Sequence, residues 1–413
     1  MSSPPDLAAA PLPRRVLLLD CDMFFVQVAK LEDPDGVGRA DLVVVGGRPG
    51  ERGVVASASY GARAFGVHSA MPMSTALRLC PNAVVVPVPR DACGRLHREI
   101  RSTLERFTPV VEAASIDEFY LDLTGTERLY GGEALTATAR RIQQAVREET
   151  RIAVSLGGGT QRLIAKLATE LAKPGGVHVV PAGAEAEFML RFDLADLPGV
   201  GPVLADTLQR RGLRTVSEAL PYDEASLCLW LGETRGRWLY RRVRGIDSAA
   251  VEPRADAKSI SHERTFAEDI YSLDELEGRL LPLVVELGAD LRRGHLRART
   301  VTAYVRDRDF RDRQVSRTLA EPLESDRAIA HVARTLLREI WARRQIGVRL
   351  LGVRLSNLAP CGAPEQMWLL DTAAPVETER DRSLAHAADR VRERFGKEAL
   401  LPARMVRERD EPE

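Results

Sequence analysis

Cysteines and aromatic residues are scarce in this sequence, and their scarcity narrows what the protein can be. Only five of its 413 residues are cysteines, and Phe, Trp and Tyr together make up 5%. No two cysteines form a Cys-x-x-Cys pair, which disfavours both a structural zinc site and a framework of disulfides. A reducing cytoplasm is therefore the expected location, with the cysteines scattered at positions 21, 80, 93, 228 and 361.

Long apolar runs are missing as well. Nowhere do about 18 apolar residues follow one another, so the sequence predicts no membrane-spanning helix. Residues 1–13 are rich in Pro and Ala but lack the basic start and apolar core of a signal peptide, and we expect a flexible N-terminus there. The chain length exceeds what one hydrophobic core usually serves, which predicts roughly two to four domains.

A net charge is also lacking, because 59 Lys and Arg residues balance 59 Asp and Glu residues. This balance argues against nucleic-acid binding, but it hides two basic clusters. Nine arginines and three acids lie between Arg292 and Arg317, and five arginines with no acid among them lie between Arg235 and Arg244. A single cluster of this kind is often a solvated face, whereas two of them favour contacts with phosphates.

Three acids stand at the ends of strand-like runs. Asp20 ends the apolar run 14–22, and the Asp117–Glu118 pair lies between the runs 110–114 and 119–123. Neighbouring side chains on a strand point to opposite faces, so we place the pair at a hairpin turn facing the end of the Asp20 strand. Clustered carboxylates are costly unless a cation neutralises them, and hard divalent ions prefer carboxylate oxygens. The pattern predicts Mg²⁺ ions that handle phosphates.

Strands and helices alternate along the first half of the chain. We expect a strand over 42–45, helices over 91–107, 135–150 and 162–171, and strands over 152–156 and 177–180. Together with the hairpin that carries the acid pair, this order is typical of a ferredoxin-like, split βαβ fold.

Two further regions follow a change of composition after residue 181. Leu197-Pro198-Gly199-Val200-Gly201 opens a helix, and a second turn precedes residues 215–220, which indicates a helix-hairpin-helix whose glycines let the backbone approach a phosphate. An ordinary helical packing unit is the alternative. Beyond residue 256, strand patterns alternate with helices over 273–292 and 329–344, which predicts a separate α+β domain. The tail is expected to be helical from 377 to 395.

The acid cluster suggests a definite chemistry. Two Mg²⁺ ions on Asp20, Asp117 and Glu118 would support nucleotidyl transfer, because one lowers the pKa of an attacking hydroxyl while the other holds a triphosphate. The backbone carbonyl of Cys21 is a candidate further ligand, and we expect Mn²⁺ to substitute for Mg²⁺. Asp22 is a weaker candidate ligand, and we expect Asp122 to be structural.

A triphosphate also needs cationic or hydrogen-bonding side chains from the protein. Tyr60 and Arg63, three residues apart in a segment of small residues, are candidates, and so is Lys173 in Lys173-Pro174-Gly175-Gly176. Each of them, taken alone, would more often be an ordinary surface residue. The glycine run 157–159 is not followed by the lysine of a phosphate-binding P-loop, so a P-loop NTPase is rejected.

The motifs taken together resemble the Y family of translesion DNA polymerases, and within it the bacterial DNA polymerase IV type. The resemblance runs from about residue 16 to residue 358. It rests on these motifs: Leu19-Asp20-Cys21-Asp22-Met23-Phe24-Phe25, Tyr60-Gly61-Ala62-Arg63-Ala64-Phe65-Gly66-Val67, Ser115-Ile116-Asp117-Glu118-Phe119-Tyr120-Leu121-Asp122, Ala165-Lys166-Leu167-Ala168 and Lys173-Pro174-Gly175-Gly176.

The resemblance implies roles for the residues in these motifs. Asp20, Asp117 and Glu118 would hold the metals and catalyse DNA synthesis from dNTPs on a primer-template. Phe25 would be the steric gate that excludes a ribose 2′-hydroxyl, with Phe24 beside it at the dNTP. Tyr60, Arg63 and Lys173 would contact the triphosphate. DNA contacts are expected from six residues: Gly199, Gly201, Arg241, Arg299, Arg306 and Arg317.

The resemblance also implies an α+β multidomain architecture. We expect a palm over 14–22 and 80–181, fingers over 23–79, a helix-hairpin-helix thumb over 182–250, a linker over 251–255 and a little finger over 256–359. Small residues, such as Ala56, Ser57 and Ala58, roof the fingers, and a site that checks shape loosely discriminates poorly. Low fidelity and tolerance of damaged templates follow as expectations, in translesion synthesis and DNA repair by a monomer.

The tail 360–413 carries one more motif. Gln366, Met367, Leu369 and Leu370 resemble the family's peptide for binding the sliding clamp, although Leu370 replaces the usual aromatic end and Trp368 fills a normally small or polar position. A hydrophobic anchor for the chain's own tail is the alternative.

Two other functions remain possible at this point. A nucleotidyl cyclase also has a palm with two aspartates, but it leaves the helix-hairpin-helix, the arginine clusters and the tail unexplained. A non-catalytic accessory protein of a mutasome would keep the polymerase shape but lose the acids, which are all present here.

Overall fold

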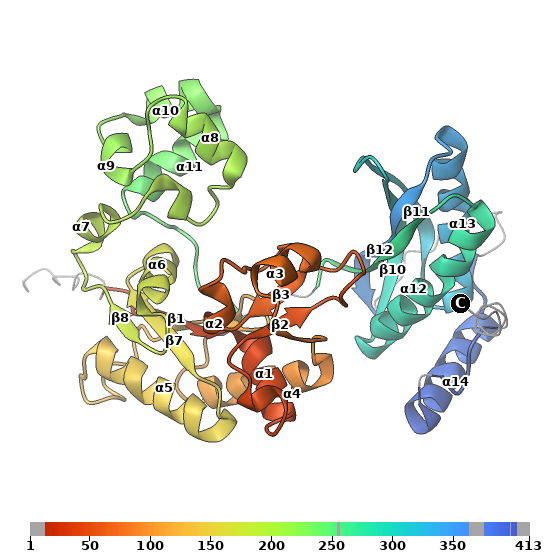
Figure 1. Ribbon diagram of the computed structural model, residues 1–413, viewed down its shortest axis with the longest axis horizontal. Helices are drawn as coiled ribbons and strands as arrows, with labels where there is room; N and C mark the ends of the chain where they lie inside the picture. The colour runs from red at the N-terminus through yellow and green to blue at the C-terminus, as the bar shows by residue number, and fades with distance from the viewer. Residues whose placement is uncertain (1–12, 254–256, 363–375, 397, 403–413) are drawn as a thin grey trace, which may run out of the picture. The chain divides into compact units, whose positions relative to one another are not determined.

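The computed structural model describes residues 13–253, 257–362, 376–396 and 398–402 (Figure 1). The chain divides into two compact units, residues 1–255 and 256–413, and each is described by itself. None of the described helices is long and apolar enough to cross a membrane.

A five-stranded sheet forms the centre of the first unit, in the order β5-β6-β1-β7-β8. Strand β1 pairs antiparallel with both neighbours, and β7 pairs parallel with β8. Helix α6 covers one face, and helices α4 and α5 cover the other (Figure 1). These elements are β1 Val16–Cys21, β5 Val111–Ala113, β6 Glu118–Asp122, β7 Val154–Gly159, β8 Val177–Val179, α4 Arg90–Glu105, α5 Leu135–Thr150 and α6 Arg162–Ala172.

The alternation of side chains along β1 decides where Asp20 points. Leu17, Leu19 and Cys21 are fully buried in the core that α4 and α5 share with the sheet. Val16 and Leu18 pack instead with residues that include Ala165 of α6. Because side chains two apart on a strand share a face, Asp20 lies on the α6 side of the sheet.

Glycines in β7 let α6 approach this face closely. A Cβ atom on Gly157 would lie 2.1 Å from the backbone nitrogen of Thr169 and 2.2 Å from the carbonyl oxygen of Ala165. Both atoms belong to the α6 backbone, so a larger residue would push the helix away. The glycine run that is not a P-loop therefore serves to seat α6 over β1 and β7.

The remainder of the first unit has one small sheet and a group of short helices. The sheet has the order β3-β2-β4, and helices α1, α2 and α3 alternate with its strands along the chain. The helical group follows β8. The bounds are α1 Phe24–Glu32, β2 Val43–Gly46, β3 Val55–Ala58, α2 Tyr60–Arg63, α3 Met73–Leu79, β4 Val84–Val86, α7 Glu185–Met189, α8 Pro202–Gln209, α9 Val216–Ala219, α10 Glu224–Leu231 and α11 Glu233–Val243, with 3-10 turns at Val37–Arg39 and Leu194–Asp196.

The second unit is a four-stranded antiparallel sheet in the order β11-β10-β12-β9. Helices α12 and α13 cover one face and form a single apolar core with it. Helix α14 contacts α13. The bounds are β9 Ser259–Ile270, α12 Leu273–Arg293, β10 Leu296–Asp307, β11 Asp312–Leu323, α13 Asp326–Arg343, β12 Val348–Pro360 and α14 Glu379–Phe395.

Ion pairs attach α14 to the rest of the second unit. The Arg292 side chain is 2% exposed and lies 2.6 Å from Asp389 of α14 and 2.8 Å from Asp326 of α13. The Glu377 carboxylate, also buried, accepts backbone N–H groups of Glu324 and Ser325 at 2.9 and 2.6 Å. Buried charges of this kind are stable only when fully paired, so α14 belongs to this unit.

The predicted fold class is confirmed, and most predicted elements lie within a few residues of the observed ones. Strand β7 continues to Gly159, whereas the sequence predicted its end at residue 156, because glycine weakens a strand unless close packing requires it. Glu118 is the first residue of β6 rather than part of the turn, and only Asp117 lies in the turn. Helices α1, α2, α3, α7, α10 and α11 were not predicted.

Candidate active site

Two of the predicted acids face each other on neighbouring strands. Asp20 of β1 and Glu118 of β6 are directly opposite in the antiparallel ladder, so their side chains share the α6 face. Asp117 precedes Glu118, and its backbone carbonyl accepts the Cys21 N–H at 3.0 Å. Asp20 is only 5% exposed. The ladder thus fixes the spacing of a mostly buried carboxylate and a half-buried one.

Two lysines from the α6 segment neutralise this pair. The Lys166 ammonium lies 2.5 Å from Glu118 Oε1 and 3.8 Å from Asp20 Oδ2. The Lys173 ammonium, just after α6, lies 2.8 Å from Asp20 Oδ2. Both lysines also contact Glu170, at 3.6 and 3.1 Å. The close seating of α6 brings these ammonium groups to the acids.

Burial and ion pairing have opposite effects on the pKa values of Asp20 and the two lysines. Burial raises the pKa of Asp20 to about 6, even though the hydrogen bond from Lys173 and the charges of both lysines act to lower it. Burial works to lower the pKa of Lys166 and of Lys173, but their carboxylate partners outweigh it, so both pKa values rise. The lysines therefore stay charged at neutral pH, and Asp20 holds its negative charge at a cost.

The residues fit a divalent cation through their chemistry, although they are not assembled as three ligands. Asp20 and Glu118 offer carboxylate oxygens on one face, and Asp117 lies one residue before Glu118. Carboxylate oxygens are the ligands that hard divalent cations prefer. The Asp117 carboxylate accepts the Ser115 hydroxyl at 2.5 Å instead of joining the pair. Within the described ranges, no group of three or more His, Cys, Asp or Glu side chains is arranged to hold a metal ion.

The two predicted dNTP-contacting phenylalanines behave differently. Phe24 is 1% exposed and belongs to the core beneath the five-stranded sheet. Its side chain packs in the core, and the contact of Phe24 with a nucleotide stays a prediction. Phe25 is only partly buried, against this core and that of the small sheet. Phe25 keeps an accessible surface, as a steric gate requires.

The predicted triphosphate residues Tyr60 and Arg63 lie together on α2. The Arg63 guanidinium stacks over the Tyr60 ring at 5.1 Å, and its Nε donates to the Ala58 carbonyl at 3.0 Å. The Tyr60 hydroxyl donates to Asp22 Oδ1 at 3.1 Å. Burial, followed by the charge of Asp22, raises the pKa of Tyr60 to about 12, so this hydroxyl keeps its proton.

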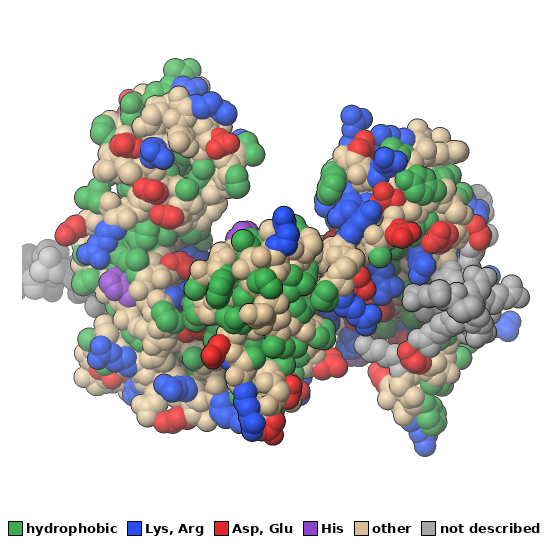
Figure 2. All heavy atoms as spheres, in the orientation of Figure 1, with side chains coloured by type: hydrophobic (Ala, Val, Ile, Leu, Met, Phe, Trp, Pro, Cys, Tyr) green, Lys and Arg blue, Asp and Glu red, His purple; other side chains and the backbone are tan. Residues whose placement is uncertain are grey.

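The larger basic cluster is mostly neutralised by acids. Seven of the nine arginines between 292 and 317 are in ion pairs, and the phosphate contacts that the sequence favours for this cluster stay a prediction. Three of the seven pair with acids at least 22 residues away, which the sequence could not show, whereas the other four pair with acids within six residues. Acidic side chains lie among the basic ones over this unit (Figure 2). The seven are Arg292, Arg293, Arg297, Arg306, Arg311, Arg313 and Arg317.

The three arginines predicted to bind DNA in this cluster do not share one face. Arg317 lies directly opposite the core residue Val301 and pairs with Glu339 of α13 at 2.7 Å, which places it on the helix-covered side. Arg306 has the other parity and lies with Asp312 on the face that no described helix covers. Arg299 stands at an irregularity of the ladder next to Ala298.

The open face carries residues that the sequence did not single out. Arg354 of β12 lies opposite Thr302, and its guanidinium stacks over the Tyr304 ring at 5.4 Å. The Tyr304 hydroxyl donates to Glu263 of β9 at 2.7 Å. A row of hydroxyl and arginine side chains therefore crosses this face beside Arg306.

The helix-hairpin-helix prediction rests on Gly199, Gly201 and Arg241. Gly199 has φ +100°, and a Cβ atom there would lie 2.6 Å from the Trp238 ring. Gly201 precedes α8, which begins at Pro202, and a Cβ atom on Gly201 would meet nothing within 4 Å. The backbone at Gly201 is thus open to a ligand.

The smaller basic cluster is also partly paired. Arg237 lies 3.0 Å from Glu224, and Arg242 lies 3.1 Å from Asp247. Arg244 donates to backbone carbonyls, which leaves Arg235 and the predicted Arg241 exposed outside these ion pairs.

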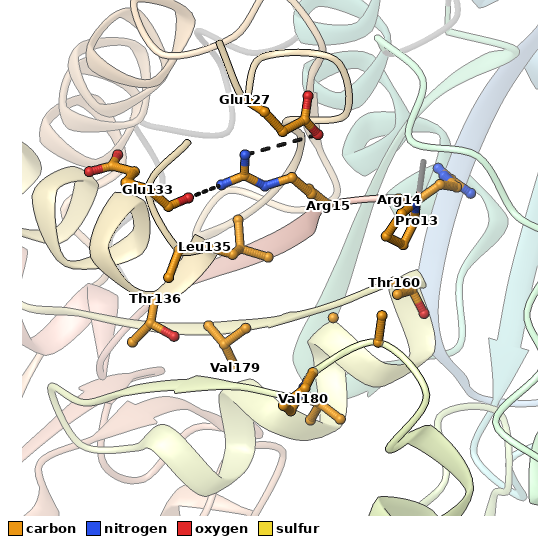
Figure 3. A pocket seen from close by; sticks show the side chains of 14 residues that line it. Pro13, Arg14, Arg15, Glu127, Glu133, Leu135, Thr136, Thr160, Val179 and Val180 are labelled. Carbon is orange, nitrogen blue, oxygen red and sulfur yellow. Dashed lines mark hydrogen bonds and ion pairs between the residues drawn. The ribbon is translucent and has the colours of Figure 1, made fainter. Parts of the chain in front are cut away.

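A cavity of about 410 Å³ lies at the other end of β1 (Figure 3). Its rim includes Arg15, which lies 4.0 Å from Glu127 and donates to the Glu133 carbonyl at 3.2 Å. Leu135 and Val179 supply apolar walls. Because the polar groups here satisfy one another and Asp20 stands at the opposite end of the strand, this cavity is separate from the acid pair.

Sequence reasoning missed two residues of the site, and one of its predictions falls on residues that the structure does not describe. Lys166 lies in a motif that was noted, but no role was given to it, and Ser155 carried no signal within its strand. The clamp-like peptide, Gln366, Met367, Leu369 and Leu370, lies outside the described residues.

Comparisons with known proteins agree with this geometry. The impB/mucB/samB family matches residues 19–170, and its C-terminal domain matches residues 257–369. The DNA polymerase IV of Halorhodospira halophila is 39% identical over 350 residues, which cover 84% of this chain and 96% of that protein. The match spans both units.

Solved structures of Y-family polymerases have the same fold. A chimera of the polymerases Dbh and Dpo4 superposes with a TM-score of 0.76 at 26% identity, covering 84% of this chain and 99% of that one. An insertion ternary complex of Dbh DNA polymerase gives 0.59 at 26% identity with the same coverage. This protein is a DNA-directed DNA polymerase of the low-fidelity, translesion kind. The chain thus belongs to the Y family of DNA polymerases, in the bacterial DNA polymerase IV type.

Proposed function

We propose that Asp20, Glu118 and Asp117 form the catalytic centre at which this polymerase adds dNTPs to a primer 3′ end. The observation that carries the proposal is the Asp20–Glu118 pair, two carboxylates fixed opposite each other on one face and balanced by two lysines. An accessory protein without catalysis is not favoured, since the acids are present and the relatives are polymerases.

Divalent metal ions are the cofactor of this reaction in the family, and we propose Mg²⁺ here, with Mn²⁺ as a substitute. Asp20 and Glu118 would hold it, together with Asp117 after its carboxylate leaves Ser115, and with the Cys21 carbonyl. When bound, the metal supplies positive charge for the attacking hydroxyl and for the triphosphate. Lys166 would remain an ion-pair partner of Glu118 and Asp20 beside the metal, and Lys173 would remain a partner of Asp20.

The protein's own groups then position the nucleotide. Lys173 is a charged donor at the Asp20 end of the site, and Arg63 on α2 is a second cation. Tyr60 keeps its proton throughout the physiological range and can act only as a neutral hydroxyl. Phe25, half-buried at the start of α1, is proposed to block a ribose 2′-hydroxyl by its bulk.

Primer-template DNA and dNTP are the proposed partners, as in the ternary complex of Dbh polymerase. DNA contacts are assigned to Gly199, Gly201 and Arg241 in the first unit and to Arg299 and Arg306 in the second, and Arg317 is a weaker candidate. The proposed domains are a palm over 14–22 and 80–181, fingers over 23–79, a thumb over 182–250, a linker over 251–255 and a little finger over 256–359. A monomer in the cytoplasm and clamp binding through residues 366–370 complete the proposal.

Single-turnover incorporation of one dNTP on an undamaged primer-template tests the catalytic centre. Glu118→Gln keeps the size of the side chain but removes its charge, and we expect a loss of about 10³-fold or more. Glu148→Gln on the exposed side of α5 is the matched control and should keep the wild-type rate. A Glu118→Gln protein that binds DNA and still incorporates dNTP at the wild-type rate would refute the assignment.

A further inference from the structure

A buried carboxylate beside the acid pair is used by neither the metal proposal nor the nucleotide proposal. Asp22 follows β1 by one residue and is 3% exposed. Its Oδ1 accepts the Tyr60 hydroxyl at 3.1 Å and the Ser155 hydroxyl at 2.9 Å, and its Oδ2 accepts the Gly175 N–H at 2.8 Å. Three donors from three separate elements, α2, β7 and the loop after α6, therefore meet on one side chain.

The backbone of Asp22 is fixed as firmly as its side chain. Its N–H donates to the Ala153 carbonyl at 3.1 Å. The Gln27 amide bridges the same two residues, because its Nε2 donates to both carbonyls, that of Asp22 and that of Ala153, while its Oε1 accepts the Ala153 N–H at 2.8 Å. Asp22 is thus held through both its backbone and its side chain.

The partners of Asp22 are the elements that carry the proposed triphosphate contacts. Tyr60 is one such contact, and its α2 helix also carries Arg63. Gly175 lies two residues after Lys173, and its N–H is shared between Asp22 and the Ser155 hydroxyl at 2.9 Å. Asp22 therefore connects the α2 side of the proposed triphosphate site to the Lys173 side through one rigid acceptor.

The single proton of Tyr60 adds a constraint. A phenol has only one O–H to donate, and here it points to Asp22. While that bond exists, Tyr60 cannot donate to a phosphate oxygen as well. Its contribution to nucleotide binding would then come from holding α2 and the stacked Arg63 in place, and Asp22 and Tyr60 would act as one unit.

We propose that Asp22 is a positioning residue that holds α2 and the Lys173–Gly175 loop at the separation needed to bind the triphosphate of an incoming dNTP. The inference rests on the proposed function of the site. It replaces the weaker role of metal ligand for Asp22, since three donors already surround its carboxylate. A charged acceptor with several donors is among the stronger hydrogen-bonding arrangements in proteins, so its removal should loosen both elements.

The test separates nucleotide binding from chemistry. Asp22→Ala should raise the KM for dNTP by about 10-fold or more while kcat falls less than fivefold, as expected when an interaction made equally in the ground and transition states is lost. The Kd for primer-template should stay at the wild-type value. The KM of Asp22→Asn for dNTP should lie between those of the wild type and Asp22→Ala. The amide Oδ1 still accepts hydrogen bonds from Tyr60 and Ser155, but the amide N–H now faces the N–H of Gly175.

A binding readout without chemistry uses a primer ended by a dideoxynucleotide, with dNTP binding followed by fluorescence. Asp22→Ala and Tyr60→Phe should each weaken this binding, and the double variant should be no worse than the weaker single variant, because the two residues act as a unit. If Asp22→Ala does not fold, Tyr60→Phe and Ser155→Ala test the same network, and each should raise the KM for dNTP.

Two results would overturn the proposal. One is a wild-type KM for dNTP in Asp22→Ala, and the other is a fall in kcat at unchanged KM, which would place Asp22 in the chemistry. Neither result touches the catalytic assignment, which fails only if Glu118→Gln retains activity. The two experiments therefore fail independently.

Discussion

The two sheets of the molecule present their functional groups in different ways. The five-stranded sheet has helices on both faces, so its functional groups gather at one end of β1 and beneath α6. The four-stranded sheet has α12 and α13 on one face, and its other face carries Arg306, Tyr304 and Arg354. A sheet covered on both sides offers a small, enclosed site, whereas a sheet covered on one side offers a broad surface.

The charges differ in the same way. In the first sheet, burial raises the pKa of Asp20 to about 6 against two opposing lysines, so the site carries an electrostatic cost. In the second unit, the arginines mostly have partners, and Arg292 is buried between two aspartates. A charged group whose pKa is strongly shifted by burial indicates a functional site, whereas charged groups that are fully paired indicate a structural role.

The largest expected effect comes from removing the costly charge. Asp20→Asn should lower dNTP incorporation by about 10³-fold or more, because a carboxylate that we propose to hold the metal is lost. The same change should stabilise the metal-free protein at pH 7 by up to about 3 kcal/mol, since about two pKa units are worth roughly that much.

The pH dependence of that gain has a definite sign. The folded-state pKa of Asp20 lies above the ordinary value of 3.8, so protonated Asp20 stabilises the fold at low pH and this contribution is lost as pH rises toward 6. The stability difference between Asp20→Asn and wild type should therefore be small below about pH 4 and full above about pH 6. Chemical denaturation in a chelator measures it, and an Asp20→Asn protein less stable than wild type at pH 7 would contradict the electrostatic account.

The second effect concerns the scaffold charges. Arg292→Ala leaves Asp389 and Asp326 without their buried partner, and we expect the second unit to lose about 3–5 kcal/mol of unfolding free energy. Arg293→Ala, which removes an exposed pair with Asp290, is the matched control and should cost less than about 1 kcal/mol. Equal costs for the two variants would remove the distinction between paired scaffold charges and surface ones.

A third effect sharpens the description of the enclosed site. Phe25→Ala should raise ribonucleotide incorporation relative to dNTP by about 10- to 100-fold, because a steric block is removed. Phe24→Ala should instead lower stability by about 3–5 kcal/mol, since Phe24 is a core residue. Single-nucleotide incorporation with paired rNTP and dNTP measures the gate, and unchanged selectivity in Phe25→Ala would contradict it.

The smallest effect concerns the open face of the second sheet. Arg306→Ala and Arg354→Ala should each weaken primer-template binding about 5-fold and lower the salt dependence by about one phosphate contact. Arg317→Ala, on the helix-covered side, should change affinity less. Fluorescence anisotropy at several salt concentrations gives both quantities. A larger loss for Arg317→Ala than for Arg306→Ala would show that DNA follows the edge of the sheet rather than its open face.

The sequence predicted the architecture well because its signals were local. The apolar run that ends at Asp20, the acid pair at 117–118 and the periodicity of residues 135–150 each fix an element without knowledge of the rest. The pairing of Asp20 with Glu118 also follows from a hairpin beside β1. Lys173 was predicted to contact the triphosphate, but its ion pair with Asp20 could not be predicted from the sequence.

Features that depend on distant partners could not be predicted. Arg317 reads as one more arginine until its partner Glu339, 22 residues away, is known. Asp22 reads as a possible metal ligand until Tyr60, Ser155 and Gly175 are seen around it. The parity of a residue on a strand can be estimated, but which face the helices cover is decided by the whole domain.

The most direct test of the central claim is the Mg²⁺ dependence of dNTP binding to the complex of enzyme and dideoxy-terminated primer-template. Wild-type enzyme should bind dNTP more tightly as Mg²⁺ rises, and Asp20→Asn and Glu118→Gln should show little or no such gain, while Glu148→Gln behaves as wild type. An equal Mg²⁺ response in all four proteins would show that the carboxylates of β1 and β6 do not hold the metal, and the account of the catalytic centre would be wrong.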